Sequence, residues 1–553
     1  MDRPDSGYDA DHHHAQGAEH ADASPPAASH TDVQRMARIE SSDSPTDMPT
    51  SLASQRPPLT EAARMIEREA DLDLTQEDPS ATSDIVHSED DDHRIPQPRG
   101  PDHREHAAPL AESAAPSSDT GETATATDYP TTSRVDLANH LEQRRLDAIR
   151  EVCAKYAIED PEKVATVKGA HQLVSDYHAP FVVDRLLDIL DHCRADVAAH
   201  PGTKVVFLGR DGDSLALAAR ELDPEFYDKH CTSVTLSRCL ADCSVQDMEN
   251  LGKSFPELKG FRTAAGDVDP GDVDGARARQ IEYLESRKVP VGTPGARIIL
   301  IDTSFRGTVQ NLLAATHSSA DFHGKYLFYS ESEGDPHASQ KTGFALHRRL
   351  DGTDIDPRAA TEQPTAVGPT PLSIFAEKDS VLALEQILRG SLSKAVRIVD
   401  GTPEQHLESP PLNQINPLEV ADRYRDDQVR LAVMDINQLA VADYAAAMAA
   451  LRRDGGSWRA EMGAKAEEFV NQVGSWCRRD SDIDPALAEF LGSFVRREDK
   501  ELVAELHGLI EERHLDSDVQ WQAYQDCGSL AEKSAYVDNV RKDTPASGGA
   551  SHG

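Results

Sequence analysis

The segment RIILIDTSFRGT, residues 297–308, is the part of the chain that decides its fold. Residues 298–301 form a continuous apolar run that ends in an acid, Asp302, and a glycine with hydroxyl neighbours follows five residues later. A short apolar run bounded by polar residues is typical of a strand that is buried on both faces. The segment therefore predicts a strand, a tight turn and a helix that begins near Thr308.

A second unit of the same kind lies earlier in the chain, in KVVFLGRDGDS, residues 204–214. Its apolar run predicts another buried strand, and residues 214–222 predict the helix that follows it. Further strands are predicted at residues 233–236 and 326–329. Because strands that alternate with helices are joined by right-handed crossovers, we predict a parallel α/β sheet flanked by helices.

The first strand-to-helix turn is predicted to bind phosphate. Open α/β sheets bind ligands at the carboxyl ends of their strands, and the N–H groups and dipole of a helix start attract anions. Gly212 allows close backbone approach, and Arg210 supplies a forked donor. We predict that Arg210 and Asp211 act in catalysis and that Gly212, Asp213 and Ser214 hold phosphate. In the alternative interpretation, Asp213 or Ser214 caps the helix and Arg210 pairs with a carboxylate.

The second turn repeats this arrangement after the strand at residues 297–301. Asp302 is placed to accept hydrogen bonds from sugar hydroxyls or to hold Mg²⁺, and is a predicted catalytic residue. The neighbouring residues predicted to bind a monophosphate are Ser304, Arg306, Gly307 and Thr308. The expected ligand is therefore a phosphorylated small molecule, a ribose phosphate or a nucleotide, with Mg²⁺ as cofactor.

The two turns resemble those of the type I phosphoribosyltransferases, most closely the hypoxanthine-guanine kind. The pyrophosphate loop of that family is similar to residues 207–212, and its signature of four apolar residues, an acidic pair and a Thr-Gly-x-Thr turn is similar to residues 298–308. The resemblance implies a Rossmann-like, phosphoribosyltransferase-like sheet, with pyrophosphate against residues 210–212. Two positions depart from the family pattern: Ile301 stands at the first acid of the pair, and Arg306 replaces the turn threonine.

Two other functions fit the same residues. Asp211 and Asp213, two apart after a strand, could be the nucleophile and acid of a haloacid-dehalogenase-like phosphatase. A non-catalytic protein that binds a nucleotide or phosphosugar is the third candidate, and Ile301 favours it. The combination of Arg-Asp-Gly (210–212), Ser-Arg (237–238) and Asp-x-x-x-x-Gly-Thr-x-Gln (302–310) is also similar to a bacterial domain found beside haloacid-dehalogenase-like and polysaccharide-biosynthesis proteins. In that resemblance, residues 383–385 and the later helices would belong to the same domain.

Composition divides the rest of the chain. The first 133 residues contain no Lys, Phe, Trp or Cys and are too poor in apolar side chains to fold. An insertion at residues 246–294 contains a Gly- and Asp-rich piece, which we interpret as a solvated loop. The predicted segments are a disordered acidic tail (1–133), a helical preface (134–200), the α/β core (201–350), a linker (351–370), a mainly helical region (371–540) and a disordered tail (541–553).

The net charge of −40 disfavours a general affinity for nucleic acid or anionic membranes, since both would repel the chain. No apolar run reaches the roughly 18 to 20 residues that span a bilayer, and the N-terminus lacks the pattern of a secretory signal. We therefore expect a cytoplasmic protein without a membrane partner. In the acidic tail, residues 59–74 could form a helix on a protein partner or a transient helix without function, and both interpretations remain open.

Overall fold

The computed structural model describes residues 134–210, 212–357, 366–367, 370–454 and 458–542 of the chain. The predicted acidic tail, with its candidate helix at residues 59–74, lies outside the described residues. Half of the predicted linker and most of the C-terminal tail also lie outside them.

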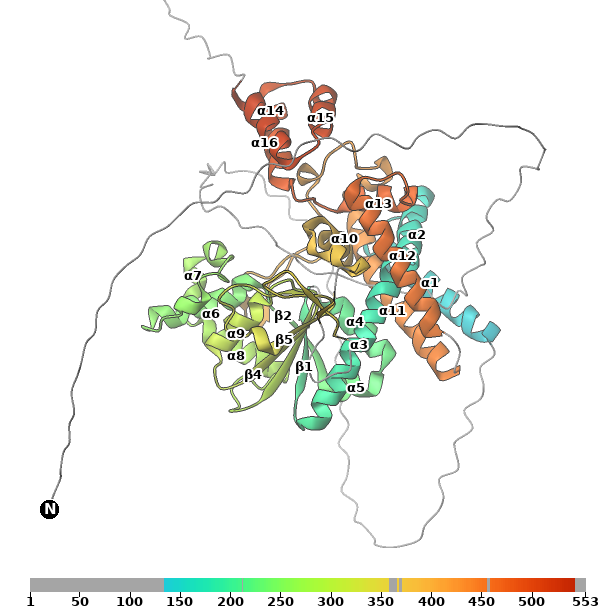
Figure 1. The fold of residues 1–553 in the computed structure, drawn as a ribbon. Helices are drawn as coiled ribbons and strands as arrows, with labels where there is room; N and C mark the ends of the chain where they lie inside the picture. The colour runs from blue at the N-terminus through green and yellow to red at the C-terminus, as the bar shows by residue number, and fades with distance from the viewer. Residues whose placement is uncertain (1–133, 211, 358–365, 368–369, 455–457, 543–553) are drawn as a thin grey trace, which may run out of the picture. The chain divides into compact units, whose positions relative to one another are not determined.

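Within the described residues, seven strands form one sheet in the order β2-β1-β3-β4-β5-β6-β7 (Figure 1). The first five strands in this order pair in parallel, and β6 and β7 add to the edge in antiparallel pairing. The prediction of an α/β fold with a mostly parallel sheet is therefore confirmed. The strands are β1 (Lys204–Gly209), β2 (Cys231–Thr235), β3 (Arg297–Asp302), β4 (Asp321–Ser330), β5 (Lys341–Arg348), β6 (Asp354–Ile355) and β7 (Ala366–Val367).

Helices cover both faces of this sheet (Figure 1). Alternate side chains of β1 belong to two different apolar cores: Val205 and Phe207 lie in one, and Val206 and Leu208 in the other. Burial on both sides explains why β1 and β3 read as unbroken apolar runs. The helices of this region are α3 (His178–Ala199), α4 (Gly212–Leu222), α5 (Pro224–His230), α6 (Arg238–Asn250), α7 (Pro270–Val273), α8 (Ala276–Ser286) and α9 (Thr308–Thr316).

Strand β5 has no counterpart among the strands predicted from the sequence. A Cβ atom at Gly343 would lie 1.9 Å from the carbonyl oxygen of Leu346. The register between β4 and β5 also shifts between Tyr326 and Phe328, which marks a bulge. Gly343 breaks the apolar pattern of β5, and the bulge makes the pairing irregular. The sequence of β5 therefore lacks the continuous apolar pattern from which β1 and β3 were predicted.

Three helices occupy residues 134–199, namely α1 (Arg134–Lys155), α2 (Pro161–Asp176) and α3. Asp160 caps α2, because its carboxylate accepts the backbone N–H groups of Glu162 and Lys163, and Pro161 occupies the first turn. These helices pack with part of the C-terminal region and with one face of the sheet in a single apolar core. The preface, the α/β core and part of the C-terminal region therefore share one apolar core.

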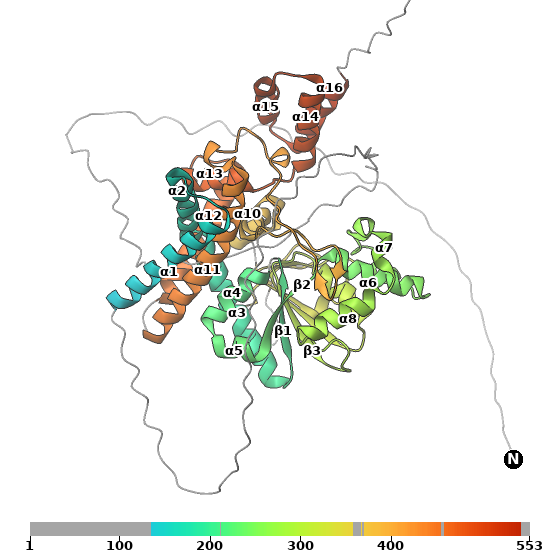
Figure 2. The same ribbon diagram turned by 180° about the vertical axis from the view of Figure 1, so that it is seen from behind.

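The C-terminal region contains two groups of helices (Figure 2). The first group shares the core of the preface, and the second has a small apolar core of its own that includes Leu506, Trp521 and Tyr524. No helix in the described part of the chain is long and apolar enough to cross a membrane. The first group is α10 (Lys378–Leu388), α11 (Asp427–Asp454), α12 (Trp458–Arg478) and α13 (Pro485–Phe494), and the second is α14 (Lys500–Arg513), α15 (Ser517–Gln525) and α16 (Leu530–Lys542).

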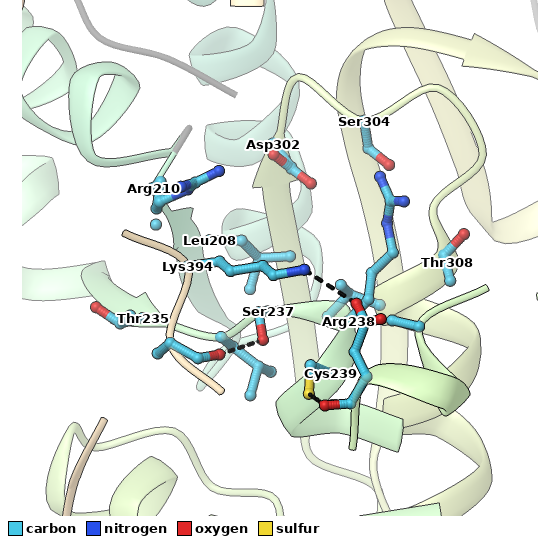
Figure 3. Close-up of a pocket in the computed structure, with 16 residues that line it drawn as sticks. Leu208, Arg210, Thr235, Ser237, Arg238, Cys239, Asp302, Ser304, Thr308 and Lys394 are labelled. Carbon is cyan, nitrogen blue, oxygen red and sulfur yellow. Dashed lines mark hydrogen bonds and ion pairs between the residues drawn. The ribbon is translucent and has the colours of Figure 1, made fainter. Parts of the chain in front are cut away.

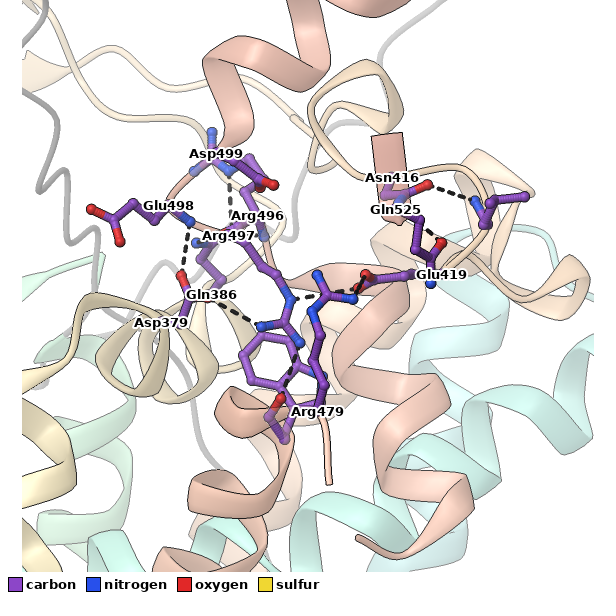
Figure 4. A network of polar contacts seen from close by, with 12 residues as sticks. Asp379, Gln386, Asn416, Glu419, Arg479, Arg496, Arg497, Glu498, Asp499 and Gln525 are labelled. Atoms are coloured by element: carbon purple, nitrogen blue, oxygen red, sulfur yellow. Dashed lines mark hydrogen bonds and ion pairs between the residues drawn. The ribbon is translucent and has the colours of Figure 1, made fainter. Parts of the chain in front are cut away.

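A polar network around Arg497 fixes the chain just before α14 (Figure 4). The guanidinium donates to Asp379 Oδ2 at 3.1 Å and to the carbonyl oxygen of Trp476 at 3.2 Å, and it lies 3.7 Å from the centre of the Trp476 ring. Asp379 also accepts the backbone N–H of Glu498 at 2.8 Å. The start of the second group is therefore attached to α10 and α12 through hydrogen bonds and stacking.

A long connector, residues 389–426, interrupts the region 371–540 that is predicted to be mainly helical. It contains only short 3₁₀ turns and a two-stranded hairpin, β8 (Ile398–Val399) with β9 (Thr402–Pro403). Prolines at 403, 410, 411 and 417 interrupt this stretch and prevent a continuous helix. The connector also reaches the carboxyl end of the sheet, where it contributes to the pocket described below.

His178, in the first turn of α3, makes the stability of the protein sensitive to acid. Its Nε2 is 3.1 Å from the carbonyl oxygen of Ala383, while its Nδ1 is buried without a hydrogen-bond partner beside the ring of Phe469. Burial lowers the pKa of His178 to about 4. The unfolded chain binds this proton near pH 6.5 and the folded protein does not, so stability is lost as the pH falls from about 6.5 to about 4.

We expect His178→Gln to flatten this pH dependence. The variant has no imidazole to protonate, so the difference between its unfolding free energy and that of the wild type should change by roughly 3 kcal/mol between pH 6.5 and 4. Urea unfolding at a series of pH values measures the two curves. The other histidines are common to both proteins and cancel in the comparison, so parallel curves would contradict the role given to His178.

Candidate functional site

A pocket opens at the carboxyl end of the sheet, where β1 and β3 end next to each other. The chain leaves β1 toward β2 on one side and returns to β3 on the other side of β1. The connections after β1 and β3 therefore diverge, and this divergence creates the crevice in which open α/β sheets hold their ligands. Among the described residues, five segments contribute to the pocket wall.

Both predicted turns contribute to this pocket. Arg210, directly after β1, and Asp302, at the end of β3, line the same cavity, and Figure 3 shows the Arg210 side chain pointing toward Asp302. The lining residues are Leu208, Gly209 and Arg210 at the end of β1 and just after it; Thr235, Leu236, Ser237, Arg238 and Cys239 at the end of β2 and after it; Asp302, Ser304, Thr308 and Val309 at the end of β3 and after it; Ala264 and Asp267 from the insertion; and Lys394 and Ala395 from the connector.

Asp302 is held in a defined orientation by the backbone that follows it. Its Oδ1 accepts the N–H of Thr303 at 2.8 Å, and the residue is only 8% exposed. Thr303 in turn donates its hydroxyl to Oε1 of the fully buried Glu385, on α10, at 3.1 Å. The carboxylate of Glu385, which belongs to the C-terminal region and does not line the pocket, therefore helps to fix the conformation of the turn after β3.

Ile301, at the position of the first acid in the family pattern, does not face the pocket. Its side chain is fully buried in the apolar core shared with the preface and the C-terminal helices. The pocket therefore has a single acid at the end of β3.

Of the four phosphate ligands predicted in the β3–α9 turn, two line the pocket and two do not. Ser304 and Thr308 line the pocket. Gly307 has a φ of 62°, and its N–H donates to Ser304 Oγ at 2.9 Å, so it shapes the turn. Arg306 Nε donates to Ser332 Oγ at 3.1 Å and its guanidinium lies over Phe261, and Arg306 is not among the lining residues.

Lys341 stabilises the β3–α9 turn through hydrogen bonds, and nothing in the sequence pattern indicates that role. Its side chain is fully buried, and Nζ donates to the carbonyl oxygen of Arg306 at 3.1 Å and to Asn311 Oδ1 at 2.8 Å. Asp335, also buried, pairs with it at 2.7 Å. Burial lowers the pKa of Lys341 to about 8, although the carboxylate of Asp335 partly offsets this effect.

Gly212, Asp213 and Ser214 hold α4 in place and are not among the residues that line the pocket. Asp211 lies outside the described residues. Asp213 accepts the hydroxyl of Ser233 at 2.5 Å, and Ser214 donates to the carbonyl oxygen of Leu388 at 3.4 Å. A Cβ atom at Gly212 would lie 2.9 Å from the carbonyl carbon of Phe207, so glycine permits the close approach of α4 to the sheet.

A third strand-to-helix turn, between β2 and α6, also reaches the pocket and was not among the predicted sites. Ser237 caps α6 by accepting the N–H of Leu240 at 3.1 Å, and its hydroxyl donates to the carbonyl oxygen of Ala395 at 2.5 Å. Arg238, the first residue of α6, extends toward Ser304 in Figure 3. A Ser directly after an apolar strand is the local signal that could have identified this turn.

Two further charged residues reach the pocket from outside the α/β units. Asp267 belongs to a short 3₁₀ turn of the insertion, and Lys394 belongs to the connector. Their side chains form an ion pair at 3.0 Å. The interpretation of residues 266–272 as a solvated loop is therefore wrong at Asp267.

The charges of the pocket favour an anionic ligand. Arg210, Arg238 and Lys394 bring three positive groups to the wall, against the two carboxylates of Asp267 and Asp302. Arg210 also lies 3.7 Å from Oε2 of Glu408, as in the alternative interpretation in which it pairs with a carboxylate. Cys239 also lines the pocket, but burial raises its pKa to about 12, so it is a protonated thiol at neutral pH.

The pocket offers few carboxylate ligands for Mg²⁺. In the described part of the chain, no group of three or more His, Cys, Asp or Glu side chains is placed to hold a metal ion. Mg²⁺ commonly takes one or two carboxylates and completes its shell with phosphate oxygens and water. Asp302 therefore fits an ion that arrives with a phosphorylated ligand.

Comparisons of the sequence with models of protein families and with curated proteins, and of the structure with solved structures, gave no match. The geometry and charge of the pocket are therefore the basis for assigning a function.

Proposed function

We propose that the pocket binds phosphoribosyl diphosphate with Mg²⁺ and that the protein is a phosphoribosyltransferase-like enzyme built on a Rossmann-like sheet. The observation that carries this proposal is that Arg210 and Asp302, from two turns far apart in the sequence, line one pocket. Ligands of this class carry phosphate groups on both sides of a ribose. The pocket has anion-binding features after β1 and β3 and a carboxylate at the end of β3.

Each part of the ligand has a suitable group in the pocket. Asp302 would accept hydrogen bonds from the ribose hydroxyls and hold Mg²⁺, and the hydroxyls of Ser304 and Thr308 would bind the 5′-phosphate. Arg210 would stabilise the diphosphate as the bond from ribose C1 to its oxygen breaks and the acceptor takes its place. When bound, Mg²⁺ supplies positive charge that neutralises the departing diphosphate.

The position of Asp213 weighs against the phosphatase alternative. A haloacid-dehalogenase-like mechanism needs the second aspartate beside the reacting phosphate, as an acid. Asp213 accepts the hydroxyl of Ser233 and does not line the pocket. A Cβ atom at Gly209 would lie 2.5 Å from Asp213 Oδ2, so the carboxylate lies against the backbone of the turn.

The burial of Ile301 favours a second candidate, a protein that binds the same ligand without turnover. The acid that the family pattern places at this position is replaced by an apolar side chain in the core. Glu385 lies near the turn, but it contacts Thr303 and is not among the lining residues. This candidate shares the ligand of the first and differs only in the reaction.

Thermal unfolding with and without phosphoribosyl diphosphate and Mg²⁺ tests the proposal. We expect the melting temperature to rise by about 3–6 °C at a ligand concentration of roughly 100 times Kd, because the ligand binds only the folded protein. Release of pyrophosphate in the presence of candidate acceptors then distinguishes an enzyme from a binding protein.

Two other results would redirect the assignment. Absence of a shift, together with phosphomonoester hydrolysis that Asp211→Asn abolishes, would indicate the phosphatase. A shift without any product would indicate the non-catalytic binding protein.

A further inference from the structure

Lys394 and Asp267 form an ion pair inside the pocket, and we call this pair the clasp. Lys394 Nζ and Asp267 Oδ2 are 3.0 Å apart, and both residues line the cavity. In Figure 3 the Lys394 side chain extends through the middle of the pocket, beside Arg210 and Arg238. The ammonium group that an incoming phosphate would meet is therefore already paired with a carboxylate of the same chain.

The backbone on both sides of the clasp is anchored to the start of α6. The hydroxyl of Ser237 donates to the carbonyl oxygen of Ala395 at 2.5 Å. Cys239 Sγ lies 3.6 Å from the carbonyl oxygen of Asp267 and 3.8 Å from that of Val396. Because the backbone is anchored, an exchange of partners requires only a rotation of side chains.

The clasp is only partly shielded from solvent. The Lys394 side chain is 40% exposed and the Asp267 side chain is 24% exposed. Ion pairs with this degree of exposure are weak. A phosphate with two negative charges that also reaches Arg210 or Arg238 would therefore compete well for Lys394, whereas a ligand with one negative charge would gain little over Asp267.

We propose that Asp267 is an internal competitor for Lys394 and makes the pocket selective for multiply charged phosphates. In the ligand-free protein the carboxylate of Asp267 holds the ammonium group of Lys394. A diphosphate that enters the pocket takes over Lys394, and the clasp opens. This inference rests on the proposed function, because it requires that the pocket binds a phosphate group.

Two simpler roles for Asp267 make different predictions. If its negative charge only repels the ligand, its removal should strengthen binding by the same factor with or without Lys394. If Asp267 is a second ligand of Mg²⁺, its removal should weaken binding when Mg²⁺ is present. Under the clasp, removal should strengthen binding, and more so when Lys394 is present, because only then is a competing partner lost.

Calorimetric titration with inorganic pyrophosphate separates these roles. The four proteins to compare are the wild type, Asp267→Asn, Lys394→Gln and the double variant, each at constant ionic strength with and without Mg²⁺. We expect Asp267→Asn to tighten binding about two- to fivefold in the wild-type background and by a smaller factor in the Lys394→Gln background. Lys394→Gln alone should weaken binding.

The connector offers a matched control. Arg397 and Glu404 form an exposed pair at 2.5 Å on the same segment, outside the pocket. Glu404→Gln removes a similar carboxylate and should leave pyrophosphate affinity unchanged. The melting temperature of each variant checks that the fold is retained.

The possible failures of the experiment are distinguishable. Equal gains from Asp267→Asn in the two backgrounds, or weaker binding by Asp267→Asn with Mg²⁺, would overturn the clasp while the proposed pocket stands. Absence of pyrophosphate and phosphoribosyl diphosphate binding in all four proteins would overturn both proposals. Binding by Asp267→Asn that is absent from the wild type and from the double variant would support the clasp in its strongest form.

Discussion

Replacing Asp302 with Asn is expected to weaken the binding of phosphoribosyl diphosphate with Mg²⁺ by about 10- to 150-fold. Asparagine has nearly the same size, and its carbonyl oxygen can still accept the N–H of Thr303, so the turn should keep its shape. The variant lacks the negative charge that would hold Mg²⁺ and accept the ribose hydroxyls. Hydrogen bonds to a charged group contribute about 1.5–3 kcal/mol, which corresponds to this range of affinities. Calorimetric titration measures the loss.

Asp213→Asn is the matched control for this experiment. Asp213 is also an aspartate that follows a strand at the carboxyl end of the sheet, but its carboxylate bonds to Ser233 and does not line the pocket. We expect this variant to lower the melting temperature more than the ligand affinity. An effect on affinity equal to or larger than that of Asp302→Asn would contradict the assignment of Asp302.

Replacing Lys341 with Met is expected to cost about 3–5 kcal/mol of unfolding free energy. Breaking a buried ion pair by removing one partner leaves the other charge buried and uncompensated, and losses of this size are typical. Asp335 has a side chain that is 1% exposed, and within the described part of the chain its remaining side-chain donors would be two neutral groups, the hydroxyl of Tyr329 and the N–H of His337. Chemical denaturation measures the loss.

An exposed pair provides the control for Lys341. Arg478 and Asp480 interact at 2.8 Å with side chains that are 57% and 41% exposed. Arg478→Met should change stability by no more than about 0.5 kcal/mol. Adding Asp335→Asn to Lys341→Met should recover part of the loss, since it removes the unpaired charge. A cost for Lys341→Met no larger than that of Arg478→Met would show that the buried pair does not support the turn.

The α/β class could be predicted because it depends on local composition. Strands β1 and β3 lie between two layers of helices, so their central residues, 205–208 and 298–301, are apolar and the runs stand out from the surrounding sequence. Strand β5 was missed for the opposite reason. Gly343 permits a close approach to the carbonyl oxygen of Leu346, a contact that no periodic pattern records. The connector was predicted as part of a mainly helical region although its prolines are a local signal against a helix.

The same distinction applies to the pocket. Arg210 and Asp302 could be found because each follows a buried strand directly, and the ends of neighbouring parallel strands lie together. Arg306 was expected in the pocket because it stands within the turn, but its side chain lies over Phe261 instead. Side-chain direction in a turn depends on which partners are within reach, and neither Phe261 nor Ser332 is near Arg306 in the sequence.

The sequence by itself therefore determined the two strand-to-helix turns and the parallel sheet that brings them together, because both follow from contiguous apolar runs. Only the tertiary structure decided the rest of the pocket. Lys341 lies in a part of the predicted core to which no element was assigned, Asp267 in the insertion and Lys394 in the predicted helical region. Their roles come from ion pairs and hydrogen bonds that the fold brings together, such as Lys341 with Asn311 and Lys394 with Asp267. A long-range ion pair leaves no local pattern, because either partner could pair equally well elsewhere until folding places them together.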